Sequence, residues 1–264
     1  MSATMFRRAV NDLRWTAIWY SLGLALYALC MVAFYPSMGK SAAYQQVLKV
    51  WPEELLHVFG ISDFGTFAGF MGGELLNLMW PLIAAAFLIT VGTATVAQEV
   101  ERGTIELWLS IPLPRWRLLS SKVVALLTGA LALVAATVAS IAVGAGIIGE
   151  SLTVGGLLGL GLELLAFSIA VAGYSAFFSS LSSTRGRAAG LAAGLTVAFY
   201  LGFVVAGFSD RWSWLQHFSI FSAYQPQQAL ATGSADLLGA AALLALGALS
   251  AATALLIFER RDAL

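Results

Sequence analysis

The sequence predicts an all-α integral membrane protein with six transmembrane helices. Hydrophobic residues make up 59% of the 264 residues and charged residues only 11%, and the mean hydropathy is +0.85. Soluble domains are less apolar, at about 45 to 50%. Six apolar segments are each long enough to cross a hydrocarbon layer of about 30 Å, which takes about 20 helical residues. We expect helices, because isolated strands cannot satisfy their backbone groups in lipid.

The whole chain, 1–264, is predicted to form one transmembrane domain. The predicted spans are 15–35, 75–97, 119–149, 152–181, 188–208 and 237–258. Before the first span, Phe6, Val10 and Leu13 are spaced to share one helical face, and charged residues take the other. This pattern predicts a short interfacial helix over residues 1–14 that lies on the membrane surface. A disordered basic anchor is the alternative.

The distribution of Lys and Arg predicts that both termini face the cytoplasm (N-in/C-in), because cytoplasmic loops are enriched in these residues. Only Lys40, Lys49 and Arg211 of the 14 Lys and Arg residues fall on the opposite side. Those on the predicted cytoplasmic side are Arg7, Arg8, Arg14, Arg102, Arg115, Arg117, Lys122, Arg185, Arg187, Arg260 and Arg261. The protein is therefore expected in a cytoplasmic membrane, and the excess of Arg over Lys hints at a bacterial source.

Two segments are expected outside the cytoplasm. Residues 36–74 mix aromatic residues with Pro, Gly and acids, and residues 209–236 are apolar but too interrupted to span, which predicts an interfacial or re-entrant segment. His57 and His217 are each solitary and Cys30 is the single cysteine, so no metal site is predicted. The Gly-Lys-Ser at 39–41 lacks the first glycine of a phosphate-binding loop, because Phe34 stands there.

Glu163, near the middle of the fourth span, is the only charged residue that lies well within a span. Charge at that depth is costly and often functional, so Glu163 is a candidate for the translocation path; a protonated, hydrogen-bonded structural residue is the alternative. Gly186, Gly190 and Gly194 recur at four-residue spacing at the start of the fifth span. Small residues at this spacing let helices approach closely, and packing within the chain is favoured over a dimer contact.

The stretch 98–122 is unusually charged for so apolar a chain. Gly103 interrupts the exit from the second span and Thr104 can cap a new helix, whose one face carries Ile105, Trp108 and Leu109. Prolines 112 and 114 then end it. This pattern predicts a short cytoplasmic helix, which either docks on a partner or rests on lipid.

The same stretch resembles the signature of ABC transporter permeases, the membrane subunits, of the type-2 export family. The family pattern is a Glu, then Gly-Thr, then E-x-L-L-x-x-P-x-x-R and a downstream Lys, and Trp108 stands where Leu is usual. The matching residues are Glu99, Gly103, Thr104, Glu106, Leu107, Leu109, Pro112, Arg115 and Lys122. Weaker similarities before the second and sixth spans extend the resemblance over most of the chain.

The resemblance implies that the short helix, within 98–117, is a coupling helix seated on a separate ATP-binding subunit. Two such subunits would bind ATP and Mg, two permease copies, identical or homologous, would pair, and this chain would be no enzyme and bind no nucleic acid. Export of a lipophilic or amphipathic cargo is the expected function; a secondary carrier or a non-transport scaffold for a cytoplasmic ATPase is the alternative. The candidate coupling residues are Glu99, Glu101, Gly103, Thr104, Glu106, Trp108, Pro112, Arg115 and Arg117.

Overall fold

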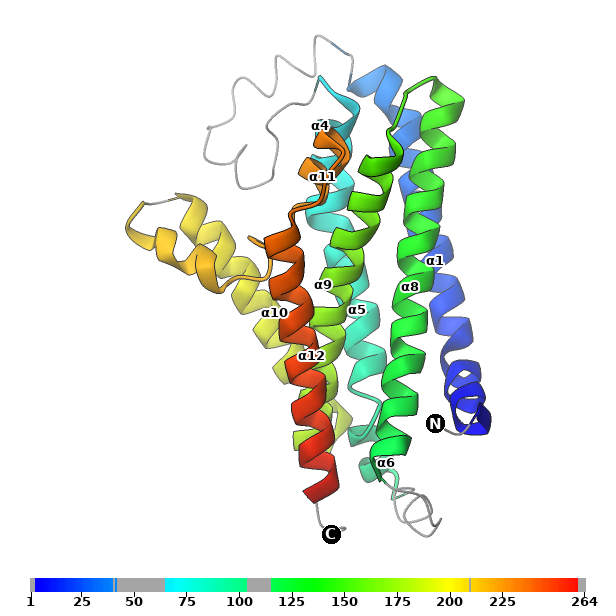
Figure 1. Ribbon diagram of the computed structural model, residues 1–264, viewed down its shortest axis with the longest axis vertical. Coiled ribbons are helices and arrows are strands. Elements are labelled where there is room, and N and C mark those ends of the chain that lie inside the picture. Colours follow the sequence, from blue (N-terminus) through cyan, green and yellow to red (C-terminus); the bar gives the residue numbers. More distant parts are fainter. Residues whose placement is uncertain (1–2, 40, 42–64, 104–114, 209, 261–264) are drawn as a thin grey trace.

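The structure is a computed structural model in which residues 3–39, 41, 65–103, 115–208 and 210–260 are described. Every element among them is helical, and six helical segments are long and apolar enough to cross a membrane, which confirms the predicted number (Figure 1). They lie in α1 (Ala3–Met38), in α4 (Phe67–Met71), η1 (Gly72–Met79) and α5 (Trp80–Gly92) together, and in α8 (Arg115–Ile148), α9 (Val154–Leu181), α10 (Arg185–Phe208) and α12 (Leu237–Arg260).

The first two spans differ from their predicted limits. Residues 3–14 do not form a separate helix but continue into the first span as α1, because no Gly or Pro interrupts them. Their position relative to a lipid surface stays a prediction. The second span begins at Phe67 and ends at Gly92, rather than covering 75–97. Glu74 therefore lies inside this span, so Glu163 is not the only ionisable residue within the six spans.

The middle of the second span is a π-helix, η1, and a proline explains why it is tolerated there. Pro81 follows it and has no N–H to donate, so the preceding turn is not held in α-helical register. The backbone N–H of Trp80 donates to the carbonyl of Leu75, five residues back. The carbonyl of Leu76 is left to another donor, the hydroxyl of Tyr224, at 2.8 Å.

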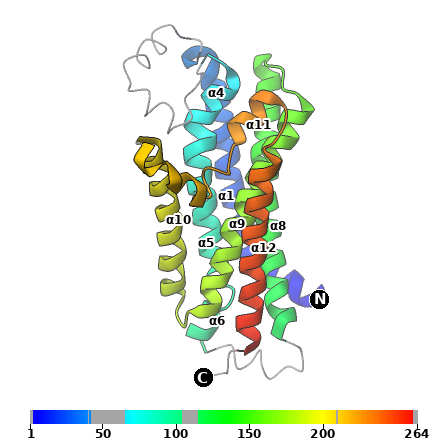
Figure 2. The same cartoon turned by 60° about the vertical axis from the view of Figure 1, so that its left-hand side comes forward.

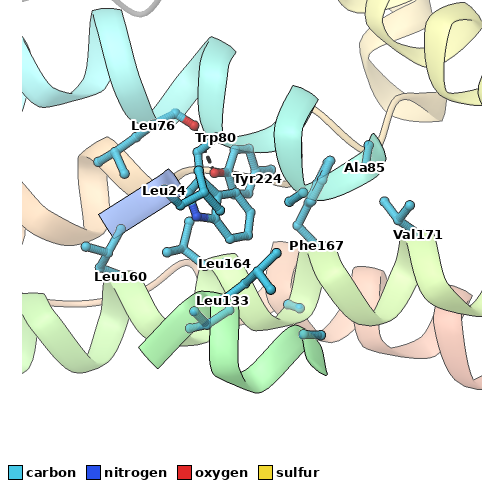
Figure 3. Close-up of a cluster of buried hydrophobic side chains, with 14 of the residues drawn as sticks. Leu24, Leu76, Trp80, Ala85, Leu133, Leu160, Leu164, Phe167, Val171 and Tyr224 are labelled. Carbon is cyan, nitrogen blue, oxygen red and sulfur yellow. Dashed lines mark hydrogen bonds between the residues drawn. The ribbon is translucent and has the colours of Figure 1, made fainter. Parts of the chain in front are cut away.

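Helix α9 is the centre of the bundle and is mostly buried from Gly159 to Ser180, as expected for a helix that is apolar all round. It packs against α5, α8, α10, α11 (Pro226–Thr232) and α12. Figure 3 shows Leu164 and Phe167 of α9 among buried side chains of its neighbours, including Trp80 and Tyr224. The indole N–H of Trp80 donates to the hydroxyl of Thr137 at 3.0 Å, which links α5 to α8.

The other helices form two close pairs and one outlier. Helix α1 lies along α8, and α12 lies along α9, where Gly173 and Gly247 let the two backbones meet. Helix α10 lies at the edge of the bundle and leads to the 3-10 helix η2 (Asp210–Phe218), which projects from it (Figure 1). The N-terminus, α6 (Ala97–Glu101) and the end of α12 lie toward one end of the bundle (Figures 1 and 2).

Residues 210–236 return to the bundle after leaving it. Neither η2 nor α11 is long enough to span a bilayer, and α11 packs against α4, η1 and α9 at the end of the bundle opposite α6 (Figure 1). Whether this segment is interfacial or re-entrant depends on its depth in a membrane, which stays a prediction.

Candidate functional site

A break in the helix separates α5 from α6 at the charged end of the bundle. Residues 93–96 form a turn in which the Thr93 and Thr95 hydroxyls donate to the carbonyls of Ile89 and Gly92, at 2.6 and 2.7 Å. Such side-chain bonds to the backbone compete with helical hydrogen bonds. The second span therefore ends here, five residues earlier than its apolar run suggests.

A serine of α9 holds this break together. The hydroxyl of Ser179 accepts from the backbone N–H groups of Val96 and Ala97, both at 3.0 Å, and donates to the carbonyl of Thr93 at 2.8 Å. One hydroxyl thus satisfies both sides of the break, and it is fully buried. Because buried backbone groups are costly when unpaired, Ser179 fixes the start of α6 to α9.

Two carboxylates of α6 connect it to other helices. Glu99 forms an ion pair with Lys122 of α8, with Oε1 and Nζ 2.8 Å apart and both side chains about one-fifth exposed, at 25% and 18%. Glu101 accepts the backbone N–H of Arg185, the first residue of α10, at 2.9 Å. The Arg185 guanidinium in turn donates to the carbonyl of Thr90 at 3.1 Å. The exit of the second span is thereby attached to α8, α9 and α10.

Gly103 ends the described part of this exit. Its φ is +68°, in the left-handed region, and its N–H donates to the carbonyl of Val100 at 3.0 Å. A Cβ placed there would meet no atom within 4 Å, so the requirement for glycine comes from the backbone alone. This is the interruption that the sequence predicts at Gly103.

The rest of the predicted coupling helix lies outside the described residues. Thr104, Glu106, Trp108 and Pro112 belong to this part. Arg115 is the first residue of α8, and the guanidinium of Arg117 lies 5.3 Å from the ring centre of Trp116, one residue before it. The roles of these residues stay predictions.

A cavity of about 730 Å³ lies beside this exit, between α1, α5, α6 and α8. Its lining includes Arg8, Asp12, Glu99, Arg102, Lys122 and Arg185 together with small and apolar side chains. A second cavity of about 550 Å³ shares Gln98, Arg102 and Arg185 with it and also includes Glu101 and Gly186.

Glu163 lies in the part of the bundle near α11, and it is fully buried. Its Oε2 accepts the backbone N–H of Gln225 at 3.2 Å, and its Oε1 accepts that of Asp236 at 3.0 Å. These two residues directly precede α11 and α12, so the carboxylate faces the positive ends of both helices. Glu163 lines neither of the two cavities above, and its contacts are those of a residue that anchors the 225–236 segment.

The three glycines of α10 are not packed against another helix. A Cβ atom added at Gly186, Gly190 or Gly194 would have no atom of the described chain within 4 Å of it. The packing within the chain that the sequence favoured is therefore not made by these residues here. The cause is the position of α10 at the edge of the bundle, where one of its faces has no neighbour.

Several residues at the charged end were missing from the sequence-based site. Ser179 is one of many small polar residues in the spans, and no local pattern singles it out. Lys122 belongs to the family pattern, but its pairing with Glu99 across 23 residues does not follow from spacing. Arg185 was assigned only to the cytoplasmic charge count.

These features define a multi-pass helical membrane protein in which a charged helix exit is attached to three other spans. The chain belongs to the ABC-2 transporter family: the family model described as "ABC-2 family transporter protein" matches residues 6–263. It is thus a permease subunit of an ABC transporter, as the resemblance predicted. A search of curated proteins gives no match.

Proposed function

We propose that this protein is the membrane subunit of an ATP-driven exporter and that the end of the bundle carrying α6 faces the cytoplasm. The excess of Lys and Arg at this end supports the orientation. A bacterial cytoplasmic membrane is the proposed location, and a lipophilic or amphipathic molecule is the proposed cargo. ATP and Mg bind to a separate nucleotide-binding subunit, present in two copies.

The observation that carries this proposal is the attachment of residues 93–101 to α8, α9 and α10. A nucleotide-binding subunit that moves the 98–117 region pulls on Glu99, Glu101 and the turn held by Ser179. Each of these contacts leads to a different span, so one displacement at the cytoplasmic end shifts three helices together. The shift between two arrangements of the spans opens the substrate path.

A second permease copy completes the proposed transporter. The face of α10 that carries Gly186, Gly190 and Gly194 is open within the chain, and small residues at this spacing suit a close helix contact. The partner copy is either identical or homologous. The open glycine face supports the pairing and gives these glycines an intermolecular role.

The test replaces each of two matched glycines. ATPase activity and export are then measured with the chain and its nucleotide-binding subunit reconstituted in vesicles. Gly103 and Gly149 both have positive φ, +68° and +78°, and at both a Cβ would meet open space. Gly103→Val, just after α6, and Gly149→Val, just after α8, therefore introduce the same backbone strain, of about 1–2 kcal/mol. We expect Gly103→Val to retain ATPase activity and to lose export at least tenfold, and Gly149→Val to retain both.

Glu106→Arg, in the predicted docking helix, is expected to uncouple ATPase activity from export in the same assay. Normal export in both Gly103→Val and Glu106→Arg would contradict the coupling role. Gradient-driven transport by the purified chain alone would instead show a secondary carrier. Nucleotide-dependent association with no transport of any lipid or amphipathic cargo would show a scaffold.

A further inference from the structure

The 730 Å³ cavity has the composition of a site for an anionic amphiphile. Its volume lies within the range of about 300–1,000 Å³ that is usual for small-molecule sites. Four of its side chains are cationic and two are anionic, so the lining has a net positive charge. The cations are Arg8, Arg102, Lys122 and Arg185, and the anions are Asp12 and Glu99.

The cavity carries charged side chains at the end of the bundle and a mixture of apolar and hydroxyl side chains, including Thr16 and Thr90, farther in. Glu99, Arg102 and Lys122 lie at the end of the bundle, close to α6. Leu13, Val91 and Ala125 line it farther toward the core, where Leu13 also lies against Gly129 of α8. A ligand with a charged head and an apolar body matches this order, whereas a fully hydrated anion matches only one half of it.

The lengths of the helices place the inner part of the cavity at the level of lipid headgroups. Helix α8 has 34 residues and is about 51 Å long, well beyond the hydrocarbon thickness of about 30 Å. Counting about 20 residues back from its end at Ile148 places the inner hydrocarbon boundary near Gly129. By this count Ala125 lies about 6 Å and Leu118 about 16 Å beyond the boundary, so the α8 side of the cavity runs from the headgroup layer, about 5–7 Å thick, into the water beyond it.

An exposed tryptophan marks the same level on α1. Trp15 lies between the cavity residues Asp12 and Thr16 but points outward, and the guanidinium of Arg14 is 5.5 Å from its ring centre. Tryptophan with an adjacent arginine is typical of the membrane interface. Two helices therefore place the inner part of the cavity at the headgroup layer.

We propose that this cavity binds the phosphate headgroup of an anionic phospholipid from the leaflet on the α6 side. The guanidinium groups of Arg8 and Arg102 attract the phosphate, and the hydroxyls of Thr16 and Ser121 are further polar groups in the lining. Leu13, Val91 and Ala125 cover the first methylenes of the chains. Because the lining joins α1 to α6 and α8, a bound lipid holds these helices together at the point where the coupling region leaves the membrane.

The test measures lipid binding to the purified chain in detergent by native mass spectrometry, without nucleotide or any partner subunit. Phosphatidylglycerol is compared with phosphatidylcholine of the same acyl chains. We expect a preference of at least about tenfold for phosphatidylglycerol in the unaltered protein. The double variant Arg8→Gln/Arg102→Gln loses most of this preference, by about 10- to 30-fold, because both side chains are exposed enough to be replaced without unfolding.

Two further variants separate the cavity from general surface charge. Ala94→Trp fills the cavity without changing any charge and is expected to reduce phosphatidylglycerol binding at least tenfold. Arg211→Gln removes an exposed arginine from η2, outside the cavity lining, and is expected to leave the binding unchanged. Circular dichroism and elution volume confirm that each variant is folded.

Three outcomes would overturn the proposal. If both lipids bind equally well, the cavity does not recognise the charge of the headgroup. If inorganic phosphate at equal concentration displaces phosphatidylglycerol, the cavity is a site for a free anion. If the double variant keeps its lipid preference but no longer binds the nucleotide-binding subunit, the cavity lining is a protein-docking surface. Since the lipid assay contains no partner, its failure leaves the proposed export function untouched, and failure of export leaves the lipid result untouched.

Discussion

At the scale of single residues, the described structure gives two buried polar side chains a structural role through backbone groups. Glu163 accepts two backbone N–H groups that lie just ahead of α11 and α12. Ser179 serves three backbone groups around the break in the second span. In both cases the side chain replaces hydrogen bonds that an interrupted helix cannot make for itself, which is why polar residues are retained in an apolar bundle.

Replacement of Glu163 tests its anchoring role. Glu163→Leu leaves the N–H groups of Gln225 and Asp236 buried without an acceptor, at a cost of about 2–5 kcal/mol. Glu163→Gln keeps one oxygen acceptor and is expected to fall between Glu163→Leu and the unaltered protein. Thermal unfolding in detergent, monitored by tryptophan fluorescence, gives the order of stability of the three proteins.

The matched control for Glu163 is Ser168→Ala on the same helix. Ser168 is buried as well, but among the described residues its hydroxyl bonds only to the Leu164 carbonyl within α9, at 2.8 Å. We therefore expect Ser168→Ala to change the unfolding temperature of the protein little. If Glu163→Leu unfolds at the same temperature as the unaltered protein, the anchoring role is wrong. If this variant is stable but deficient in transport, a role of Glu163 in the translocation path regains support.

At the scale of elements, the sequence predicted the helices better than their ends and contacts. Six apolar runs were sufficient for six spans, because length and hydropathy are properties of each run alone. The start of the second span was missed because Phe67 and Met71 precede the Gly-Gly pair at 72–73, and its end because the Thr93 and Ser179 contacts depend on a distant helix. The open side of α10 depends likewise on where neighbouring helices lie.

The connection between α6 and α9 is tested with Ser179→Ala. This change removes the acceptor of the Val96 and Ala97 N–H groups, so we expect hydrogen exchange of these two amides to accelerate at least tenfold. In the reconstituted transporter the same variant is expected to retain ATPase activity and to lose export. Ser175→Ala is the control, because its hydroxyl bonds only to the Val171 carbonyl in its own helix, at 2.7 Å. Equal exchange in both variants would argue against the connection.

At the scale of the whole molecule, the charged contacts and the 225–236 segment occupy opposite ends of α9. The exit of the second span is attached near Ser179, and the 225–236 segment is attached near Glu163. Helix α9 therefore connects the region proposed to receive the motion with the region that covers the far end of the bundle. A continuous helix, buried over most of its length, can transmit such a motion as one unit.

The proposed orientation is tested by cysteine labelling in intact cells. Cys30 is exposed, so it is first replaced by serine, and the labelling variants are made in this Cys30→Ser protein. Ser151→Cys, in the exposed connection between α8 and α9, is expected to react with a membrane-impermeant maleimide from outside. Glu259→Cys, at the exposed end of α12, is expected to react only after the membrane is permeabilised. The reverse pattern would contradict the N-in/C-in topology.

The bonds of Glu163 also set an order in which the protein can be made. Its two donors follow it by 62 and 73 residues, so α9 enters the membrane before either donor has been synthesised. Until then a carboxyl group lies among apolar helices without its final hydrogen bonds, which is unfavourable. A chain that stops before Gln225 therefore lacks both donors, and one that stops between Gln225 and Asp236 lacks the second.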